Sequence, residues 1–243
     1  MLSVTKSMAL QGLNGTLINV EVDVSSGMPM WEIIGLPDVS VKESKERVKT
    51  AIKNCGIDMP SRRYIINLSP ADLRKEGSYF DLAISVGVLK SIGILDNADI
   101  SNTIFIGELS LDSKVKRVNG VLPICIEALK YGIKRVIVPK ENAKEAAIIR
   151  DLEIIGVSDL QTLIKYLKGE IIIDREIAEI ENIFEKEIEY EIDFSEVKGQ
   201  EIAKRALEIA SAGGHNILMV GSPGSRKDDD GKKSKNNFTR FNI

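Results

Sequence analysis

The chain has 243 residues, of which 43% are hydrophobic and 28% charged, and its formal net charge at pH 7 is −3. This balance is typical of a globular protein with a sizeable core, and it excludes nucleic-acid binding through a strongly basic overall charge. No stretch approaches the length of a membrane span, and the first residues lack the apolar core of a signal peptide, so we expect a cytoplasmic protein. The two cysteines, Cys55 and Cys125, lack metal-ligand spacing and indicate buried thiols in a reducing compartment.

The amino-terminal part of the chain predicts an α/β domain. The first 36 residues alternate in strand fashion, most clearly over 17–24 and 31–36. A capping box of Ser40 and Glu43 is expected to open a helix over 41–54. Further strands are expected over 64–68, 103–109, 135–138 and 153–157, and further helices over 80–92, 122–131, 142–150 and 160–167. Because strands and helices alternate from residue 37 to 168, we expect a layered α/β domain with an extra antiparallel portion at its front.

The amino-acid composition changes after this domain, which we place at residues 1–168. Residues 169–193 are rich in Glu and Ile and indicate a linker between domains. A second module is predicted over 194–225, with an amphipathic helix over 199–212 and a buried strand over 216–220. Residues 226–243 contain few strongly apolar side chains and are expected to be disordered.

A glycine-rich turn follows the expected strand at 216–220. In a P-loop, with the pattern G-x-x-x-x-G-K-[S/T], backbone amides wrap the phosphates, the Lys reaches the outer phosphates and the hydroxyl holds Mg²⁺. The residues in register with that pattern are Gly221, Ser222, Pro223, Gly224, Ser225 and Lys227. Arg226 stands where the second glycine belongs and Asp228 stands where the Ser or Thr belongs, so the motif is broken. A plain turn is the alternative interpretation of this segment.

A single inserted nucleotide accounts for the break. If one A precedes the codon for the expected glycine, codons for Gly-Lys-Thr-Met-Met-Ala are read as Arg-Lys-Asp-Asp-Asp-Gly, which is the sequence at 226–231. We therefore hypothesise that the chain is a frameshifted, truncated product of a longer ATPase gene. By itself it is expected to bind nucleotide weakly or not at all and to hydrolyse no ATP.

Five long blocks of sequence are specific enough to point to a family. They occupy residues 33–56 (IIGLPDVSVKESKERVKTAIKNCG), 61–87, 107–124, 132–146 and 213–225 (GGHNILMVGSPGS). These blocks resemble the magnesium chelatase-like AAA+ proteins of the YifB/ComM type, and the resemblance covers nearly all of residues 1–225. It implies an amino-terminal domain with the two-layer α/β fold of the Lon protease domain, followed by an AAA+ ATPase module.

The same resemblance implies ligands and partners for an intact protein. The family members bind ATP and Mg²⁺ and work as homo-hexamers, and the competence-associated members are DNA helicases that drive branch migration during natural transformation. Val197, Gly199 and Gln200 resemble the element that lies beside adenine in AAA+ proteins, and a simple helix start is the alternative.

The Lon-like fold raises the question of peptidase activity. Lon enzymes use a Ser nucleophile with a Lys base. The resemblance places Tyr79 at the nucleophile position and Leu122 at the base position, and Ser78 lies one residue away with no base predicted beside it. We therefore expect no peptidase activity, and we assign no catalytic residue and no metal ligand.

A few further residues are candidates for binding. Four basic residues are a candidate DNA surface, with solvated loop charges as the alternative: Arg62, Arg63, Arg74 and Lys75. Trp31 is expected in the core or an interface, because no second aromatic residue suggests a stacking platform, and His215 is expected to pack or to form hydrogen bonds. The rival functions are a stand-alone protein-binding or DNA-binding module without catalysis and, more weakly, a metal-insertion chaperone.

Overall fold

The structure, a computed structural model, describes residues 2–178 and 199–220. The chain divides into two units, Met1–Ile180 and Glu181–Ile243. Among the residues described, no helix has the length and apolar character needed to cross a membrane.

A seven-stranded sheet forms the centre of the first unit, in the order β3-β4-β2-β1-β5-β8-β9. These strands span Leu2–Gln11 (β1), Asn14–Ser25 (β2), Met30–Ile34 (β3), Arg63–Ser69 (β4), Thr103–Phe105 (β5), Arg135–Pro139 (β8) and Glu153–Val157 (β9). A separate ribbon pairs β6 (Glu108–Leu109) with β7 (Val115–Lys116). β2 pairs antiparallel with β1 and with β4, whereas β5, β8 and β9 run parallel to one another, as β3 does to β4. The predicted α/β fold with an antiparallel portion at its front is therefore confirmed.

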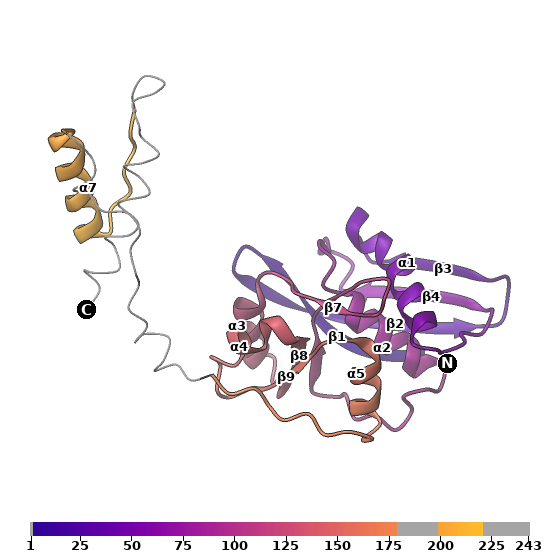
Figure 1. Ribbon diagram of the computed structural model, residues 1–243. Coiled ribbons are helices and arrows are strands. Elements are labelled where there is room, and N and C mark those ends of the chain that lie inside the picture. Colours follow the sequence, from indigo (N-terminus) through magenta and orange to yellow (C-terminus); the bar gives the residue numbers. More distant parts are fainter. Residues whose placement is uncertain (1, 179–198, 221–243) are drawn as a thin grey trace. The chain divides into compact units, whose positions relative to one another are not determined.

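Helices pack on both faces of this sheet (Figure 1). One face carries α1 (Val39–Asn54), α2 (Asp81–Ser91) and α5 (Leu160–Leu167), whose buried residues form a single core with β2 and β4. The other face carries α3 (Val121–Lys130), the short turn η1 (Lys140–Asn142) and α4 (Ala143–Ala146) around a second core. In the parallel part, successive residues of one strand enter different cores: Ile137 of β8 lies in the first core, and Val136 and Val138 lie in the second.

Strand β1 approaches α2 closely through small hydroxyl side chains. Ser3 Oγ donates to the Gly87 carbonyl oxygen at 2.6 Å, and Thr5 Oγ1 donates to the Ala83 carbonyl oxygen at 2.8 Å. A Cβ at Gly87 would lie 2.8 Å from Val22 Cγ2, so glycine is needed at this crossing. The buried side of β1 is thus partly polar, and hydrophobic alternation alone does not reveal it.

Most expected boundaries differ from the structure by a few residues, and three of the differences have a clear cause or are large. Helix α1 is capped by Asp38, whose carboxylate accepts from the Val41 amide at 2.8 Å, so the capping box at Ser40 is wrong by two residues. The strand expected over 103–109 divides at Gly107, whose amide bonds the Tyr79 carbonyl oxygen at 2.9 Å instead of a sheet partner. The helix expected over 142–150 ends at Ala146.

The expected linker begins with residues that belong to the first unit. The Glu176 amide donates to the Ile154 carbonyl oxygen of β9 at 2.8 Å, and the Glu176 carboxylate pairs with Lys140 Nζ at 2.9 Å. Ile173 packs against the first core. Since these contacts hold the chain beside β9, residues 169–178 are an arm of the first unit, and the remainder of the expected linker, 179–193, lies outside the described residues.

The described part of the second unit contains one helix, α7 (Glu201–Gly213). Gly214 ends it in a left-handed conformation, and the His215 amide donates to the Ala210 carbonyl oxygen at 2.8 Å. Residues 216–220 form no strand, and Leu218 is 87% exposed, so the predicted buried strand is wrong for the residues described. The physical reason is that residues 199–220 contain no other strand with which this segment could pair.

Candidate functional site

The predicted phosphate-binding turn lies outside the described residues. This applies to Gly221, Ser222, Pro223, Gly224, Ser225 and Lys227, and also to Val197. Gly199 and Gln200 are described, and both have left-handed backbone conformations, with φ of +74° and +60°. Gln200 is the N-cap of α7, and its carbonyl oxygen accepts from the Lys204 amide at 2.9 Å, so these two residues form the start of a helix.

The four basic residues predicted as one DNA surface are separated in the structure. Lys75 is fully buried, and its amine donates to the Pro70 carbonyl oxygen, so its inclusion in a surface is wrong. Burial lowers the pKa of Lys75, and the Asp72 carboxylate opposes that shift. Arg74 is exposed and pairs with Glu76 at 3.3 Å. Arg62, in contrast, lines a pocket of the first unit.

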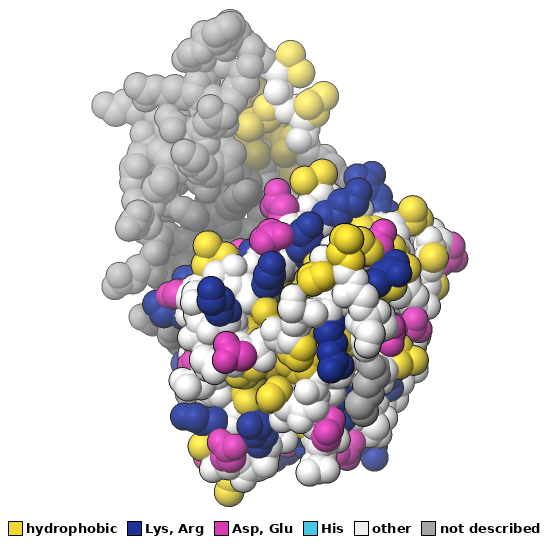
Figure 2. Space-filling model, turned by 90° about the vertical axis from the view of Figure 1, so that its right-hand side faces the viewer, with side chains coloured by type: hydrophobic (Ala, Val, Ile, Leu, Met, Phe, Trp, Pro, Cys, Tyr) yellow, Lys and Arg dark blue, Asp and Glu magenta, His cyan; other side chains and the backbone are white. Residues whose placement is uncertain are grey.

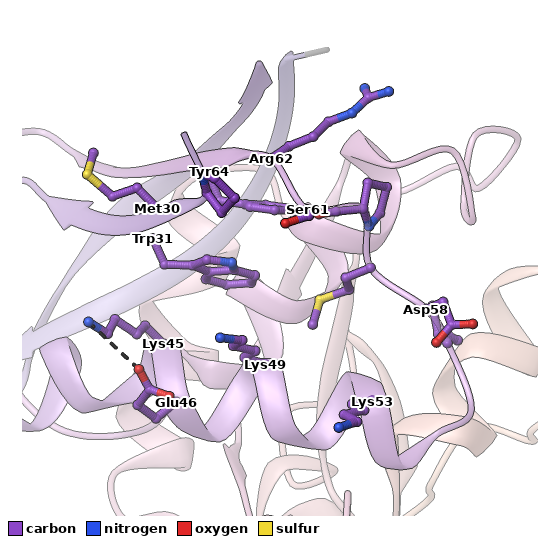
Figure 3. A pocket seen from close by; sticks show the side chains of 14 residues that line it. Met30, Trp31, Lys45, Glu46, Lys49, Lys53, Asp58, Ser61, Arg62 and Tyr64 are labelled. Atoms are coloured by element: carbon purple, nitrogen blue, oxygen red, sulfur yellow. Dashed lines mark hydrogen bonds and ion pairs between the residues drawn. The ribbon is translucent and has the colours of Figure 1, made fainter. Parts of the chain in front are cut away.

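That pocket, called the α1 groove below, has a volume of about 430 Å³ and lies between α1 and the ends of β3 and β4 (Figure 3). Its lining residues come from three segments: Pro29, Met30 and Trp31; Lys45, Glu46, Lys49 and Lys53; and Ile57, Asp58, Met59, Pro60, Ser61, Arg62 and Tyr64. Four of these side chains are cationic and two are carboxylates, so the groove is locally basic in a chain that is acidic overall. Its volume falls within the range of small-molecule sites.

An aromatic pair forms one wall of the α1 groove. Trp31 and Tyr64 are directly opposite each other on the parallel strands β3 and β4, and their rings stack at 4.5 Å between centroids and 22° between planes. Tyr64 is 1% exposed, and its hydroxyl donates to the Pro60 carbonyl oxygen at 2.8 Å, which fixes the ring behind Trp31. Trp31 packs against the first core, as expected, but the reason given for that expectation, the lack of a second aromatic residue, is wrong, because a pairing between residues 33 positions apart is invisible in the local pattern.

Helix α1 supplies the opposite wall. Lys45, Lys49 and Lys53 recur every four residues, so they lie on one side of the helix at intervals of roughly 6 Å. Figure 3 shows Trp31 between Tyr64 on one side and Lys45 and Lys49 on the other. This spacing is visible in the sequence (KESKERVKTAIK), but only the fold shows that the three lysines line the same groove as the aromatic pair.

The surroundings of the α1 groove remain accessible and basic. Lys49 and Lys53 are exposed, and the pair between Lys45 Nζ and Glu46 Oε1 is long, at 3.7 Å. Burial raises the pKa of Tyr64, and the positive charge of Arg62 opposes that shift. On the face seen in Figure 2, Lys and Arg side chains border exposed hydrophobic ones.

A buried ion pair fixes the position of α1 relative to α2. Arg47 Nε donates to Asp81 Oδ2 at 2.7 Å, and its Nη2 atom donates to Asp81 Oδ1 at 3.1 Å. The bond to Asp81 raises the pKa of Arg47. Asp81 is fully buried and also accepts from the Leu109 amide at 3.1 Å, so its carboxylate joins α1, α2 and β6. This network sets the orientation of the helix that carries the groove lysines.

At the positions that correspond to the Lon catalytic residues, the structure shows other contacts. Ser78 Oγ donates to Glu108 Oε2, and Tyr79 packs against Phe80 with ring centroids 4.6 Å apart. The Leu122 amide bonds Glu145 Oε1 at 3.3 Å. In residues 2–178 and 199–220, no group of three or more His, Cys, Asp or Glu side chains is placed to hold a metal ion.

Comparison with known proteins adds named relatives. The chain is 35% identical over 230 residues to competence protein ComM of Haemophilus influenzae, covering 93% of this chain and 44% of that protein. It is 36% identical over 226 residues to the uncharacterized protein YifB of Escherichia coli, with the same coverage of 93% and 44%. A weaker similarity, 29% identity over 182 residues, relates it to Lon protease 2 of Bacillus subtilis, covering 66% of this chain and 32% of that protein. The chain thus spans less than half the length of these relatives.

Two family models match the chain in succession. One, described as subunit ChlI of Mg-chelatase, matches residues 20–142, and the other, described as magnesium chelatase, subunit ChlI, matches residues 193–230. The first match includes all of β3, α1 and β4, which form the α1 groove, and the second includes α7. With a Lon-like α/β fold in the first unit and family matches in both units, the chain belongs to the magnesium chelatase ChlI family, in the branch that includes ComM and YifB.

Proposed function

We propose that the protein is part of an ATP-driven machine that acts on DNA, and that its first unit contributes a nucleic-acid contact. The proposal is supported by the ChlI family matches and by the relative named competence protein ComM. The observation that carries it is the α1 groove, which is lined by three lysines on one side of a helix and by a stacked aromatic pair. Basic side chains bind phosphates and aromatic rings stack on bases, so this combination suits nucleic acid better than a neutral ligand.

Binding of labelled DNA to the whole chain tests this proposal. Addition of the protein should raise the fluorescence anisotropy of labelled single-stranded and forked oligonucleotides at moderate salt. The affinity should fall steeply as the salt concentration increases. Lys49→Glu should weaken binding, whereas Lys165→Glu, which reverses an exposed lysine on α5, should have little effect. If no DNA structure binds at low salt, the proposal fails.

The second unit is proposed to be the beginning of an AAA+ ATPase module. In an intact protein, Lys227 would contact the phosphates of ATP, and Gly199 and Gln200 would lie near the adenine, with Mg²⁺ and a homo-hexameric ring completing the machine. In this chain Arg226 and Asp228 depart from the phosphate-binding pattern, so we assign it no step of ATP hydrolysis. Isothermal titration with Mg·ATP should detect weak binding or none, and micromolar binding would contradict this expectation.

A changed reading frame near Arg226 is proposed as the origin of this departure. The second family match ends at Asp230, so residues 231–243 fall outside both matched ranges. Sequencing genomic DNA from the codon for Val220 onward tests the idea. The frameshift hypothesis is supported if an alternative reading frame encodes Gly-Lys-Thr at this point and then stays open for several hundred bases. If neither alternative frame encodes that continuation, the first unit is better explained as a stand-alone binding module.

A further inference from the structure

The indole of Trp31 has one face fixed and one face directed into the α1 groove. Tyr64 covers the first face, and the groove lies on the side of Lys45 and Lys49 (Figure 3). Trp31 is half-buried and packs its edge against the first core, together with Ile57 and Met59. A ring held in this way needs little further ordering before a planar group stacks on it, which favours binding.

Cationic groups of α1 lie along the open side of the groove at a regular spacing. Lys45, Lys49 and Lys53 follow one side of α1 at intervals of roughly 6 Å, whereas the Arg62 guanidinium points away from Trp31 (Figure 3). The interval resembles the separation of neighbouring phosphates in an extended strand. A chain of nucleotides can therefore lie along the helix with each phosphate near a cation while one base enters the groove.

We propose that the α1 groove binds single-stranded nucleic acid, with one unpaired base stacked on Trp31 and the adjoining phosphates held by Lys45, Lys49 and Lys53. This inference rests on the proposed function and names the ligand of its DNA contact. A duplex does not fit, because its bases are already stacked on each other and only its phosphates are available. A free mononucleotide would use the indole but only part of the row of lysines.

The chain provides its own reporter, because Trp31 is its only tryptophan. We would titrate the whole chain with an oligo-dT of about 12 nucleotides, within the size range of single-strand sites, and record tryptophan emission and the anisotropy of a labelled oligonucleotide together. The emission should be quenched and should saturate at the concentration at which the anisotropy saturates. Duplex DNA, dTMP and poly-glutamate of similar length serve as the three comparison ligands.

Variants separate stacking from charge. Trp31→Leu should weaken binding of the labelled oligonucleotide by between about 5-fold and about 100-fold. Trp31→Tyr should bind nearly as well as the wild type, because tyrosine also stacks on a base. A merely structural role of Trp31 does not predict this recovery. The slope of log K against log salt should be about −2 for three phosphate contacts and should become shallower by about 0.7 in Lys49→Ala. Lys165→Ala on α5 should leave the slope and the quenching unchanged, and circular dichroism should show that each variant is folded.

The outcomes distinguish this inference from the proposed function. If the oligonucleotide binds without quenching Trp31 and regardless of the groove lysines, DNA binds elsewhere, so the inference is wrong while the proposed function stands. If no nucleic acid binds, both are wrong. Three other outcomes overturn the inference. If dTMP binds as tightly as oligo-dT, the groove is a site for a free nucleotide, and if duplex DNA binds and quenches equally well, the groove does not prefer single strands. If poly-glutamate binds as tightly as oligo-dT, the ligand is an acidic protein.

Discussion

The antiparallel and parallel parts of the sheet are stabilised in different ways. In the parallel part, β8 and β9 read RVIVP and EIIGV and are buried on both faces. In the antiparallel part, β2 alternates from Ile18 onward, with Val20, Val22 and Val24 buried and the intervening residues only partly covered. Fully covered parallel strands and half-covered antiparallel strands are expected to differ in this way.

This difference determines where polar chemistry is possible. Around the parallel part, both cores are largely hydrophobic, and a buried polar exception is Asn142, whose side chain accepts from the Val118 amide at 3.0 Å and donates to the Val118 carbonyl oxygen at 2.9 Å. The other half of the sheet, in which β2 pairs antiparallel with β1 and β4 and β3 runs parallel to β4, lies beside the buried pair of Arg47 and Asp81, the hydroxyl contacts of β1 with α2, and the α1 groove. The molecule thus combines a hydrophobic scaffold with a region whose geometry depends on polar contacts, and the following variants test that contrast.

The largest effect is expected from Asp81→Ala. The variant leaves the Arg47 guanidinium, whose side chain is 19% exposed, without its buried carboxylate, and it also removes the acceptor for the Leu109 amide. We expect a loss of about 3–5 kcal/mol in the free energy of unfolding, measured by urea denaturation. The double variant Arg47→Met/Asp81→Leu should lose less than Asp81→Ala alone. A cost below about 1 kcal/mol for Asp81→Ala would show that the pair does not stabilise this region.

In the hydrophobic scaffold, Ile124→Ala should cost about 2–5 kcal/mol, since Ile124 is fully buried in the second core and its truncation leaves a cavity. Ile126→Ala is the matched control on the same helix, because Ile126 is 45% exposed and should cost within about 0.5 kcal/mol of zero. Equal losses for the two variants would mean that α3 does not pack as the structure shows.

A pH effect is expected at Cys125 in the same core. Burial, with a smaller contribution from the Glu145 charge, raises the pKa of the Cys125 thiol to about 12 from its ordinary value of 9.0. Above pH 9 the unfolded chain therefore loses this proton while the folded chain keeps it, so the free energy of unfolding falls by about 1.4 kcal/mol per pH unit until about pH 12. Cys125→Ala should remove this part of the alkaline dependence, whereas Cys55→Ala, at a half-buried thiol, should remove less. Parallel pH profiles for the wild type and Cys125→Ala would contradict the assignment.

The smallest effect is expected at the outer edge of the parallel part. Arg135 of β8 and Glu153 of β9 are cross-strand partners, with Nε and Oε2 2.8 Å apart, but both side chains are about one-third or more exposed. Glu153→Gln should therefore cost about 0.2–1 kcal/mol. The difference from the wild type should shrink in 1 M salt, and a salt-independent loss would indicate a packing effect instead.

The sequence predicted these two parts of the sheet unequally. The hydrophobic runs of β9 and α5 were predicted with the bounds that the structure shows, because each element is marked by its own composition. β1 is weakly marked, since Ser3, Thr5 and Ser7 occupy its buried side. The α1 cap at Asp38 also differs, because the side chain that bonds the Val41 amide is selected by the path of the preceding loop.

The candidate site was predicted less well than the fold. Arg62 and Trp31 were identified individually, but the α1 groove depends on the parallel pairing of β3 with β4 and on the position of α1, which distant residues determine. Lys75 is adjacent to exposed basic residues in the sequence, yet its backbone amide bonds the Leu36 carbonyl oxygen at 3.1 Å and its side chain is buried. The P-loop pattern predicts the phosphate-binding turn from the sequence alone, and this turn lies outside the described residues.

The arm beside β9 has a mechanical consequence. It anchors the carboxyl-terminal end of the first unit at one edge strand, while the α1 groove lies at the other edge strand, β3. Six interstrand steps, at about 4.8 Å each, separate these edges by roughly 29 Å. Suppose that a nucleic-acid strand is held in the groove while the chain beyond the arm is pulled. The pulling force is then transmitted across the sheet, from each β-strand to the next, through the hydrogen bonds that pair them. The sheet as a whole then carries the force. The pair of neighbouring β-strands with the weakest hydrogen bonding limits the force that the unit can transmit.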